Sequence, residues 1–399
     1  MANGAMIATL NSVMKEFYLP PVVEQLNNEV LLLSRLEARD QEISGKSAFV
    51  PVHTGRSGGI GARGEYVQLP EPGAQSYSRA EYTLKYLYGV VRVSGPSIEL
   101  TSSEMGSFVQ ALRSELDGIR NDLRKDVSRQ VYGDGTGAIA TCGVTAAANV
   151  VVLASAEPID KGQLYVGMIV DIGTAAAPTA VASGRAITAV NSATPSFTID
   201  GAAVTTAGTD FVGRSGVRTA GATYEMSGIQ QLISTSANTF GGINAATNAF
   251  WDNIRDTAGT AVSESRLMQG FNRVRIAGGE VSAIYTGFGN QRVLWESLTS
   301  LRRFNDPMKI EGGFQTLDFM GKPVIADVDA PNSKVFLLDE RFIKVFSNRD
   351  WHFLDQDNST LKWDTNYDAW KAVLARYMNL GATRRNTQAV LTTNNTSGY

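Results

Sequence analysis

The chain has 399 residues, enough for two or three domains with substantial hydrophobic cores. Hydrophobic residues make up 43% of it and charged residues 19%, and the net charge of −3 argues against a protein that coats nucleic acid. The single cysteine, Cys142, excludes an internal disulfide and favours folding in a reducing compartment. No signal sequence or membrane-length apolar run is evident, so we expect a protein made in a cytoplasm, without a membrane partner.

The N-terminal segment, residues 1–46, has a helical pattern. Pro20 and Pro21 suit a helix start. The apolar residues that follow lie on one face: Val22, Leu26, Val30, Leu33 and Leu36. On a free arm such a face would be a liability, so we expect another subunit to cover it, with Leu26, Val30 and Leu33 as contacts. Docking on the chain's own core is the open alternative.

A glycine- and proline-rich segment, residues 55–78, separates two arms with strand patterns at 47–54 and 80–94. In the second arm, apolar residues recur at every other position from Tyr82 to Val90. The segment between the arms carries too little bulky apolar surface to fold by itself, and loops this long are commonly functional. We therefore predict a hairpin that reaches onto a neighbouring subunit. The contact candidates in this segment are Arg56, Arg63, Glu65, Tyr66 and Leu69.

A long amphipathic helix is predicted next. Thr101 and Glu104 form a capping box, and Gly133 ends the helix. Its apolar stripe consists of Phe108, Leu112, Leu116, Ile119, Leu123, Val127 and Val131. One narrow stripe over roughly eight turns predicts a strut laid across a sheet.

Between residues 143 and 222 alanine, glycine, threonine and valine dominate. Short strand patterns at 168–172, 185–190 and 196–199 predict a small inserted β-barrel or sandwich. Beyond it we expect helices at 226–234, 263–276 and 290–301 and strands at 281–286, 323–326, 335–338 and 342–346. Residues 367–376 look helical. The fold class is therefore α+β with a β insertion.

Sequence motifs for catalysis, cofactors and metals are weak. The two histidines, His53 and His352, are too few for a metal or triad site. The glycine-rich residues 133–137 follow a helix and lack the lysine of a phosphate loop, and residues 355–366 lack the glycine and glutamate of a calcium loop. We expect no enzyme activity, no cofactor and no metal. The pairs Arg302–Arg303 and Arg384–Arg385 could contact DNA or carboxylates of another subunit, and we expect pairing between subunits for both.

In element order the chain resembles the major capsid proteins of tailed bacteriophages, the Hong Kong 97-type fold. The resemblance rests on the long helix that ends in residues 132–137, on the phrase 166–172 and on the phrases 319–327, 334–339 and 343–346. It implies an N-terminal arm (1–46), an E-loop hairpin (47–95), a spine helix with the peripheral domain (96–142) and an insertion domain (143–222). An axial domain (223–347) and a segment that completes the peripheral domain and forms the C-terminal tail (348–399) follow.

The resemblance also implies a function. Copies of the chain would form hexamers and pentamers of an icosahedral shell, a virion capsid that is assembled in the host cytoplasm. The shell would enclose double-stranded DNA without sequence-specific binding. A separate scaffolding protein, a portal and possible decoration proteins would be partners; the arm-like sequence begins close to Met1, which leaves no room for a built-in scaffold.

Some members of that family crosslink covalently through a lysine of the E-loop. Here no lysine lies between Gly55 and Arg79, and Lys46 and Lys85 stand at the bases of the arms. Arginines are poor nucleophiles, so we predict a shell without covalent crosslinks. The alternatives are an encapsulin-like compartment shell of the same fold, or a β-rich receptor- or carbohydrate-binding virion protein.

Overall fold

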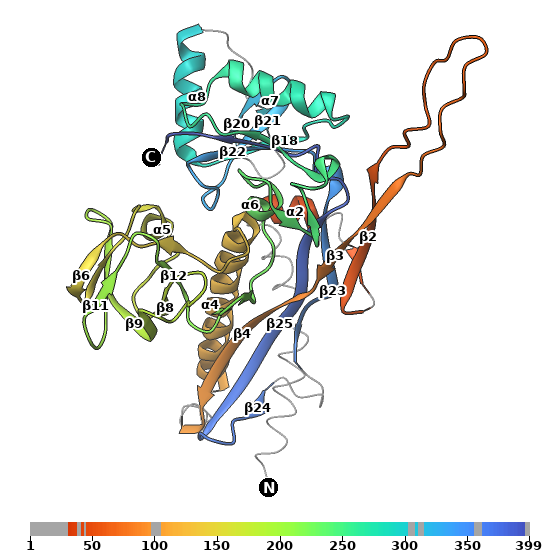
Figure 1. Ribbon diagram of the computed structural model, residues 1–399. Coiled ribbons are helices and arrows are strands. Elements are labelled where there is room, and N and C mark those ends of the chain that lie inside the picture. Colours follow the sequence, from red (N-terminus) through yellow and green to blue (C-terminus); the bar gives the residue numbers. More distant parts are fainter. Residues whose placement is uncertain are drawn as a thin grey trace.

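A computed structural model describes residues 31–37, 41–43, 45–96, 105–301, 308–309, 315–354 and 361–395. It has four parts: a long sheet with a helix along it, a β-barrel, a second sheet flanked by helices, and a projecting hairpin (Figure 1). The expected α+β class with a β insertion is confirmed.

The long sheet is built around β25 (Ala369–Ala382). This strand pairs antiparallel with β4 (Lys85–Ser94) over ten residues on one edge and with β23 (Ile343–Phe353) and β24 (Lys362–Trp363) on the other. A short β1 (Gln41–Glu42) pairs in parallel with β23. The helix predicted at 367–376 is therefore wrong. A strand buried on both faces loses its alternation, and alanines three residues apart at 369, 372 and 375 imitate a helical period.

Helix α4 (Met105–Tyr132) runs along this sheet, as predicted (Figure 1). Its 28 residues span about 42 Å, and it ends directly before Gly133. Leu123 and Ile119 of the predicted stripe pack onto Gly89 of β4, where an added Cβ would lie 2.5 and 3.1 Å from them. The capping box at Thr101 lies outside the described residues.

The hairpin consists of β2 (Ser47–Gly55) and β3 (Ser76–Thr83), which pair antiparallel. The first predicted arm is confirmed and the second must be corrected, because residues 80–94 form two strands in two sheets. The buried positions change from even to odd numbers at this point: Tyr82 and Leu84 are buried before β4, whereas Leu87 and Val91 are buried within it. The alternation of apolar residues from Tyr82 to Val90 therefore does not reveal that the chain changes from one sheet to another.

The barrel comprises β5 (Ala140–Thr141), β12 (Phe211–Arg214), β8 (Ile169–Gly173), β9 (Ala182–Asn191), β10 (Ser196–Ile199) and β7 (Val150–Val152), in spatial order. A bridge between Cys142 and Leu153 joins its two edges, and β6 (Thr145–Ala148) pairs with β11 (Val204–Thr206) beside it. A separate apolar cluster fills its interior. The predicted small inserted barrel is confirmed.

The second sheet, here called the upper sheet, has the order β17 (Ile254–Asp256), β26 (Ala389–Thr392), β22 (Lys334–Leu338), β18 (Ala283–Thr286), β21 (Lys322–Ala326), β20 (Gln315–Phe319) and β19 (Met308–Lys309). Side chains from α7 (Glu264–Ile276) and α8 (Phe288–Leu301) share one apolar cluster with it. Both helices and the strands expected at 281–286, 323–326 and 335–338 are confirmed. Of residues 226–234, only α6 (Ile229–Leu232) is helical.

Two strands lie elsewhere than expected. The strand expected at 342–346 belongs to the predicted axial domain (223–347), but β23 follows η2 (Glu340–Phe342) and joins the long sheet, so residues 343–347 lie there instead. Conversely, β26 returns from the long sheet and pairs with β22 and β17. The chain thus crosses between the sheets more than once, which ties them into one body.

The remaining short elements are α5 (Glu157–Asp160), β13 (Arg218–Thr219), β14 (Ala222–Thr223), β15 (Thr239–Phe240), β16 (Ile243–Asn244) and η1 (Ala249–Trp251).

Candidate assembly surfaces

The root of the hairpin is fixed rigidly in the core. The ring of Tyr82 packs against Phe346 and Phe240, with centroids 5.3 and 5.5 Å away. Its hydroxyl donates a hydrogen bond of 2.8 Å to the carbonyl of Ala382, and burial raises its pKa. A Cβ on Gly381 would lie 2.9 Å from this ring. The direction in which the hairpin leaves the body is therefore set by close packing.

Further from the body, the two chains of the hairpin come close together again. The register shifts between His53 and Gly55, after which the two strands end. The Ser57 hydroxyl then donates a 2.8 Å hydrogen bond to the carbonyl of Gly73, and a Cβ on Gly73 would lie 2.7 Å from the nitrogen of Gly58. Glycine is needed here because the two chains approach so closely. This constriction separates residues 60–70, here called the lobe, from the arms.

The lobe presents apolar side chains to solvent. Ile60, Tyr66 and Leu69 are 83%, 100% and 78% exposed, and Val67 is also exposed. Such a cluster on a projecting hairpin is typical of a surface that a partner covers. Figure 1 shows the hairpin extending well beyond the rest of the molecule.

The predicted contact residues in this segment fall into two groups. Glu65, Tyr66 and Leu69 lie exposed in the lobe, as does Arg63, which donates a hydrogen bond to the carbonyl of Ala62. Arg56 lies apart from them, below the constriction, with its guanidinium 5.9 Å from the ring centroid of Phe250 in the same chain. The structure brings four of the five together and leaves Arg56 at the body.

The N-terminal contact candidates need a correction. Helix α2 (Leu31–Glu37) packs on its own chain, and Leu33 is only 3% exposed. Arg35 of this helix forms a two-pronged contact of 3.0 and 3.1 Å with the buried carboxylate of Glu340, which also accepts a hydrogen bond from Tyr285. Leu33 is therefore not available to a neighbour, and the alternative of docking on the chain's own core is the observed one. Leu26, Val30, Arg302 and Arg303 lie outside the described residues. The pairing between subunits expected for Arg385 is wrong, because this side chain is fully buried and donates a 2.7 Å hydrogen bond to the carbonyl of Leu232 in its own chain.

A surface that the sequence analysis missed lies on the long sheet. Because α4 covers Leu87, Gly89 and Val91 of β4, the alternate residues point to the other side of the sheet. Tyr86, Tyr88 and Val90 are about half exposed there, and Tyr377 of β25 meets the two tyrosine rings edge-on. We call this the open face. The alternating tyrosines were visible in the sequence, but only the pairing with β25 shows that they point outward.

The two histidines lie in different parts of the fold. His53, on β2, hydrogen-bonds Gln75, whereas His352 is buried on β23 with its ring against Tyr377. Within the residues that the structure describes, no group of three histidine, cysteine, aspartate or glutamate side chains could hold a metal ion.

Burial raises the pKa of the Cys142 thiol to about 12, so this thiol is a poor nucleophile. In the same described ranges no helix is long and apolar enough to span a membrane.

Comparisons with known proteins give a likeness of structure and none of sequence. No protein-family model matches this sequence, and no curated protein sequence matches it significantly. A chain of the cyanophage A-1(L) capsid asymmetric unit is similar in structure, with a TM-score of 0.57 and 14% identity, over 92% of this chain and 93% of that chain. A chain of the holo-SrpI encapsulin complex from Synechococcus elongatus PCC 7942 aligns with a TM-score of 0.48 and 9% identity, over 90% of this chain and 86% of that chain. A chain of the capsid of a native GTA particle gives 0.45 and 10%, over 90% of both chains.

Proposed function

We propose, from the Hong Kong 97-type fold of this chain, that it is a structural subunit that assembles with copies of itself into a closed protein shell. The expected fold is confirmed, since the similarity to the cyanophage A-1(L) capsid chain runs through nearly the entire length of both. The observation that carries the proposal is the lobe: four apolar side chains at the end of a hairpin whose root is rigid. The chain itself leaves this surface exposed, and a neighbouring copy would bury it.

The finer proposal is a tailed-phage capsid. Hexamers and pentamers of the chain would form an icosahedral shell around double-stranded DNA, assembled in the host cytoplasm with a separate scaffolding protein and a portal. Many small contacts, each weak, then give a stable particle by multivalency, and contacts between unlike surfaces close into rings. Nuclease-protected DNA in purified particles would support the phage capsid; protein cargo without DNA would support the compartment shell instead.

The first experiment removes the apolar groups of the lobe. In the triple variant Ile60→Ser, Tyr66→Ser and Leu69→Ser, we expect the yield of particles to fall by at least about tenfold, because burial of these side chains is lost. The unfolding free energy of the subunit should not change, because the side chains are exposed. The control Val144→Ser with Ile276→Ser removes apolar groups that are 79% and 86% exposed outside the hairpin. Equal particle yields from both variants, by sedimentation and negative-stain microscopy, would contradict the proposal.

The polar groups of the lobe are tested separately. Exchange of the charges in Arg63→Glu with Glu65→Arg keeps the net charge but reverses the local pattern. We expect it to impair shell formation while the subunit stays folded, because like charges would then face each other across the contact. An unchanged particle yield would remove both residues from the interface.

The open face is the second surface that we propose assembly covers. Tyr86→Ser with Tyr88→Ser should lower the particle yield. The rings expose apolar area to water in the unassembled subunit, and a neighbouring copy would bury that area. If this variant assembles as the wild type does, the open face is a free surface of the particle.

A further inference from the structure

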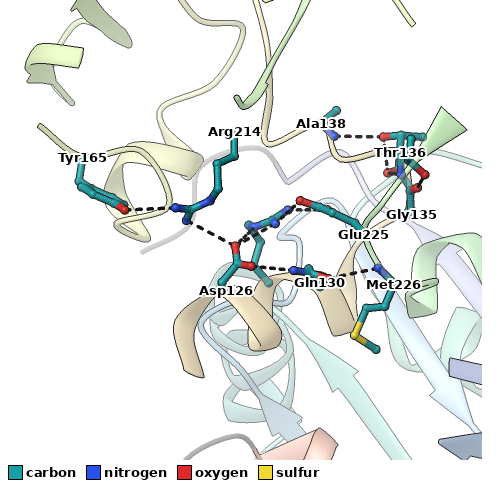
Figure 2. A network of polar contacts seen from close by, with 12 residues as sticks. Asp126, Gln130, Gly135, Thr136, Ala138, Tyr165, Arg214, Glu225 and Met226 are labelled. Carbon is teal, nitrogen blue, oxygen red and sulfur yellow. Dashed lines mark hydrogen bonds and ion pairs between the residues drawn. The ribbon is translucent and has the colours of Figure 1, made fainter. Parts of the chain in front are cut away.

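The barrel is bonded to the C-terminal half of α4. Asp126 of the helix lies 3.5 Å from the guanidinium of Arg214 on β12, which also donates a 3.4 Å hydrogen bond to the hydroxyl of Tyr165 (Figure 2). Arg129, one turn on, is bonded to Asp126 and to Glu225, where the chain leaves the barrel. The side chains of Arg129 and Glu225 are buried and that of Asp126 is mostly shielded from water, so these three charged groups fix one another, while Arg214 is half-exposed.

The barrel is also bonded to the upper sheet, through its helix α5. The Lys161 ammonium, whose side chain is only 4% exposed, donates a 2.9 Å hydrogen bond to the carbonyl of Ala330 and lies 2.6 Å from the Glu157 carboxylate. The same carboxylate accepts a 3.1 Å hydrogen bond from the amide of Asn332. We call this arrangement of Glu157 and Lys161 around residues 330–332 the clamp.

The residues held by the clamp lie in the loop between β21 and β22 and are hydrogen-bonded to the elements around the upper sheet. The side chain of Asn332 accepts a hydrogen bond from the amide of Gly289 at the start of α8, and its carbonyl accepts bonds from Asn290 and Thr393. A third contact of the barrel, a 3.0 Å bond from Gln163 to Asp329, lies beside the clamp. The barrel thus holds α4 with one side and the upper sheet with another.

We infer that the inserted barrel is a brace. It fixes the angle between two parts of the subunit: the long sheet together with α4, and the upper sheet. The inference rests on the proposed function, because this angle sets the curvature of a shell built from the subunit. Two polar contacts on different sides of a rigid barrel oppose rotation about the short connections between the sheets. This role differs from that of a receptor- or carbohydrate-binding module, which would present its binding groups to solvent.

The test removes both charges of the clamp together, so that neither is left buried alone. The variant is Glu157→Gln with Lys161→Met. Its matched control is Glu280→Gln with Lys322→Met, an exposed ion pair of the same chemistry and 2.9 Å separation on the upper sheet. Gln163→Ala is a milder second variant, in case the first does not fold. Two readouts are used: the distribution of particle diameters, and hydrogen exchange of residues 327–332 in the unassembled subunit.

For the clamp variant we expect exchange at these amides to rise about tenfold and the share of particles with the wild-type diameter to fall several-fold. The milder variant should change both readouts in the same direction, and the control should change neither. Wild-type exchange and wild-type diameters in either folded clamp variant would overturn the brace. Failure of the wild-type chain to form any particle would instead count against the proposed function, while the exchange readout would still test the brace.

Discussion

At the scale of the residue, Tyr82 decides how the hairpin leaves the body. Its ring fills the space that Gly381 and Gly241 leave open, and its hydroxyl satisfies a backbone carbonyl of β25. A buried hydroxyl without a partner would be costly, so its bond both stabilises the core and fixes the root. The lobe can serve as a positioned contact only because this residue is immobilised.

We predict that Tyr82→Phe lowers the unfolding free energy by about 1–2 kcal/mol, because the carbonyl of Ala382 loses its buried donor. Urea denaturation measures the change. Tyr66→Phe is the control, since its hydroxyl lies in water and its removal should cost nothing measurable. Equal stability of the two variants would show that the Tyr82 hydrogen bond does not contribute.

Asp126 makes the contact between barrel and helix dependent on pH. Burial, the largest single influence, raises its pKa, but the charges of Arg129 and Arg214 and hydrogen bonds from Arg129 and Gln130 together hold the pKa below its ordinary value of 3.8. A lowered pKa in the folded state stabilises the fold above that value, and the contribution is lost as the pH falls through the folded pKa.

We therefore expect Asp126→Asn to lower the unfolding free energy at pH 7 by about 2 kcal/mol, the value of hydrogen bonds to a charged group. The difference between variant and wild type should shrink as the pH falls below about 4. Denaturation curves recorded from neutral to acid pH measure it. A difference that stays constant across this range would mean that the carboxylate charge has no role.

At the scale of the element, the contact between α4 and β4 rests on a missing side chain. Gly89 lies under Leu123 and Ile119, so the helix can approach the strand closely. Because side chains alternate along a strand, Tyr86 and Tyr88 point to the opposite side of the sheet and form the open face.

Two glycine substitutions, one at this contact and one on the exposed surface of α4, should have opposite effects. Gly89→Ala places a methyl group 2.5 Å from Leu123 and should destabilise the fold by about 1–3 kcal/mol through overpacking. In α4, Gly118→Ala meets no heavy atom within 4 Å and should stabilise it by about 0.5–1 kcal/mol through helix propensity. Thermal unfolding of both variants measures the effects; a neutral Gly89→Ala would mean that α4 can move away from the sheet.

At the scale of the whole molecule, one compact body carries a projecting hairpin that is fixed at its root and whose lobe the body does not cover. The two sheets are joined by the chain itself, which passes from the upper sheet into β23 and from the long sheet into β26, and by the barrel, which is bonded to α4 and to the loop before β22. In an assembly of the proposed kind, a body joined in this way would transmit the direction of its hairpin from one copy to the next. We propose that this stiffness makes the curvature of an assembly reproducible.

Particles should be held together without covalent bonds between subunits. The hairpin between Gly55 and Arg79 contains no lysine, and Lys85 donates its ammonium proton to the carbonyl of Thr223 at 2.6 Å. Although burial lowers the pKa of Lys85, this bond keeps its nitrogen turned to its own chain. Boiled, reduced particles should therefore run as one band of monomer size on a denaturing gel, and a ladder of multimers would refute this.

By itself, the sequence determined the elements whose pattern is local: the helix before Gly133, the first arm of the hairpin, the barrel strands and the exposed lobe. In each, the periodicity of apolar residues or the shortage of them follows from short-range geometry. The tertiary structure alone decided which sheet a strand joins, and so it reassigned residues 85–94, 343–347 and 389–392. It also buried Leu33 under its own chain and turned the tyrosines of β4 outward. These outcomes depend on partners far away in the chain, which a local pattern does not encode.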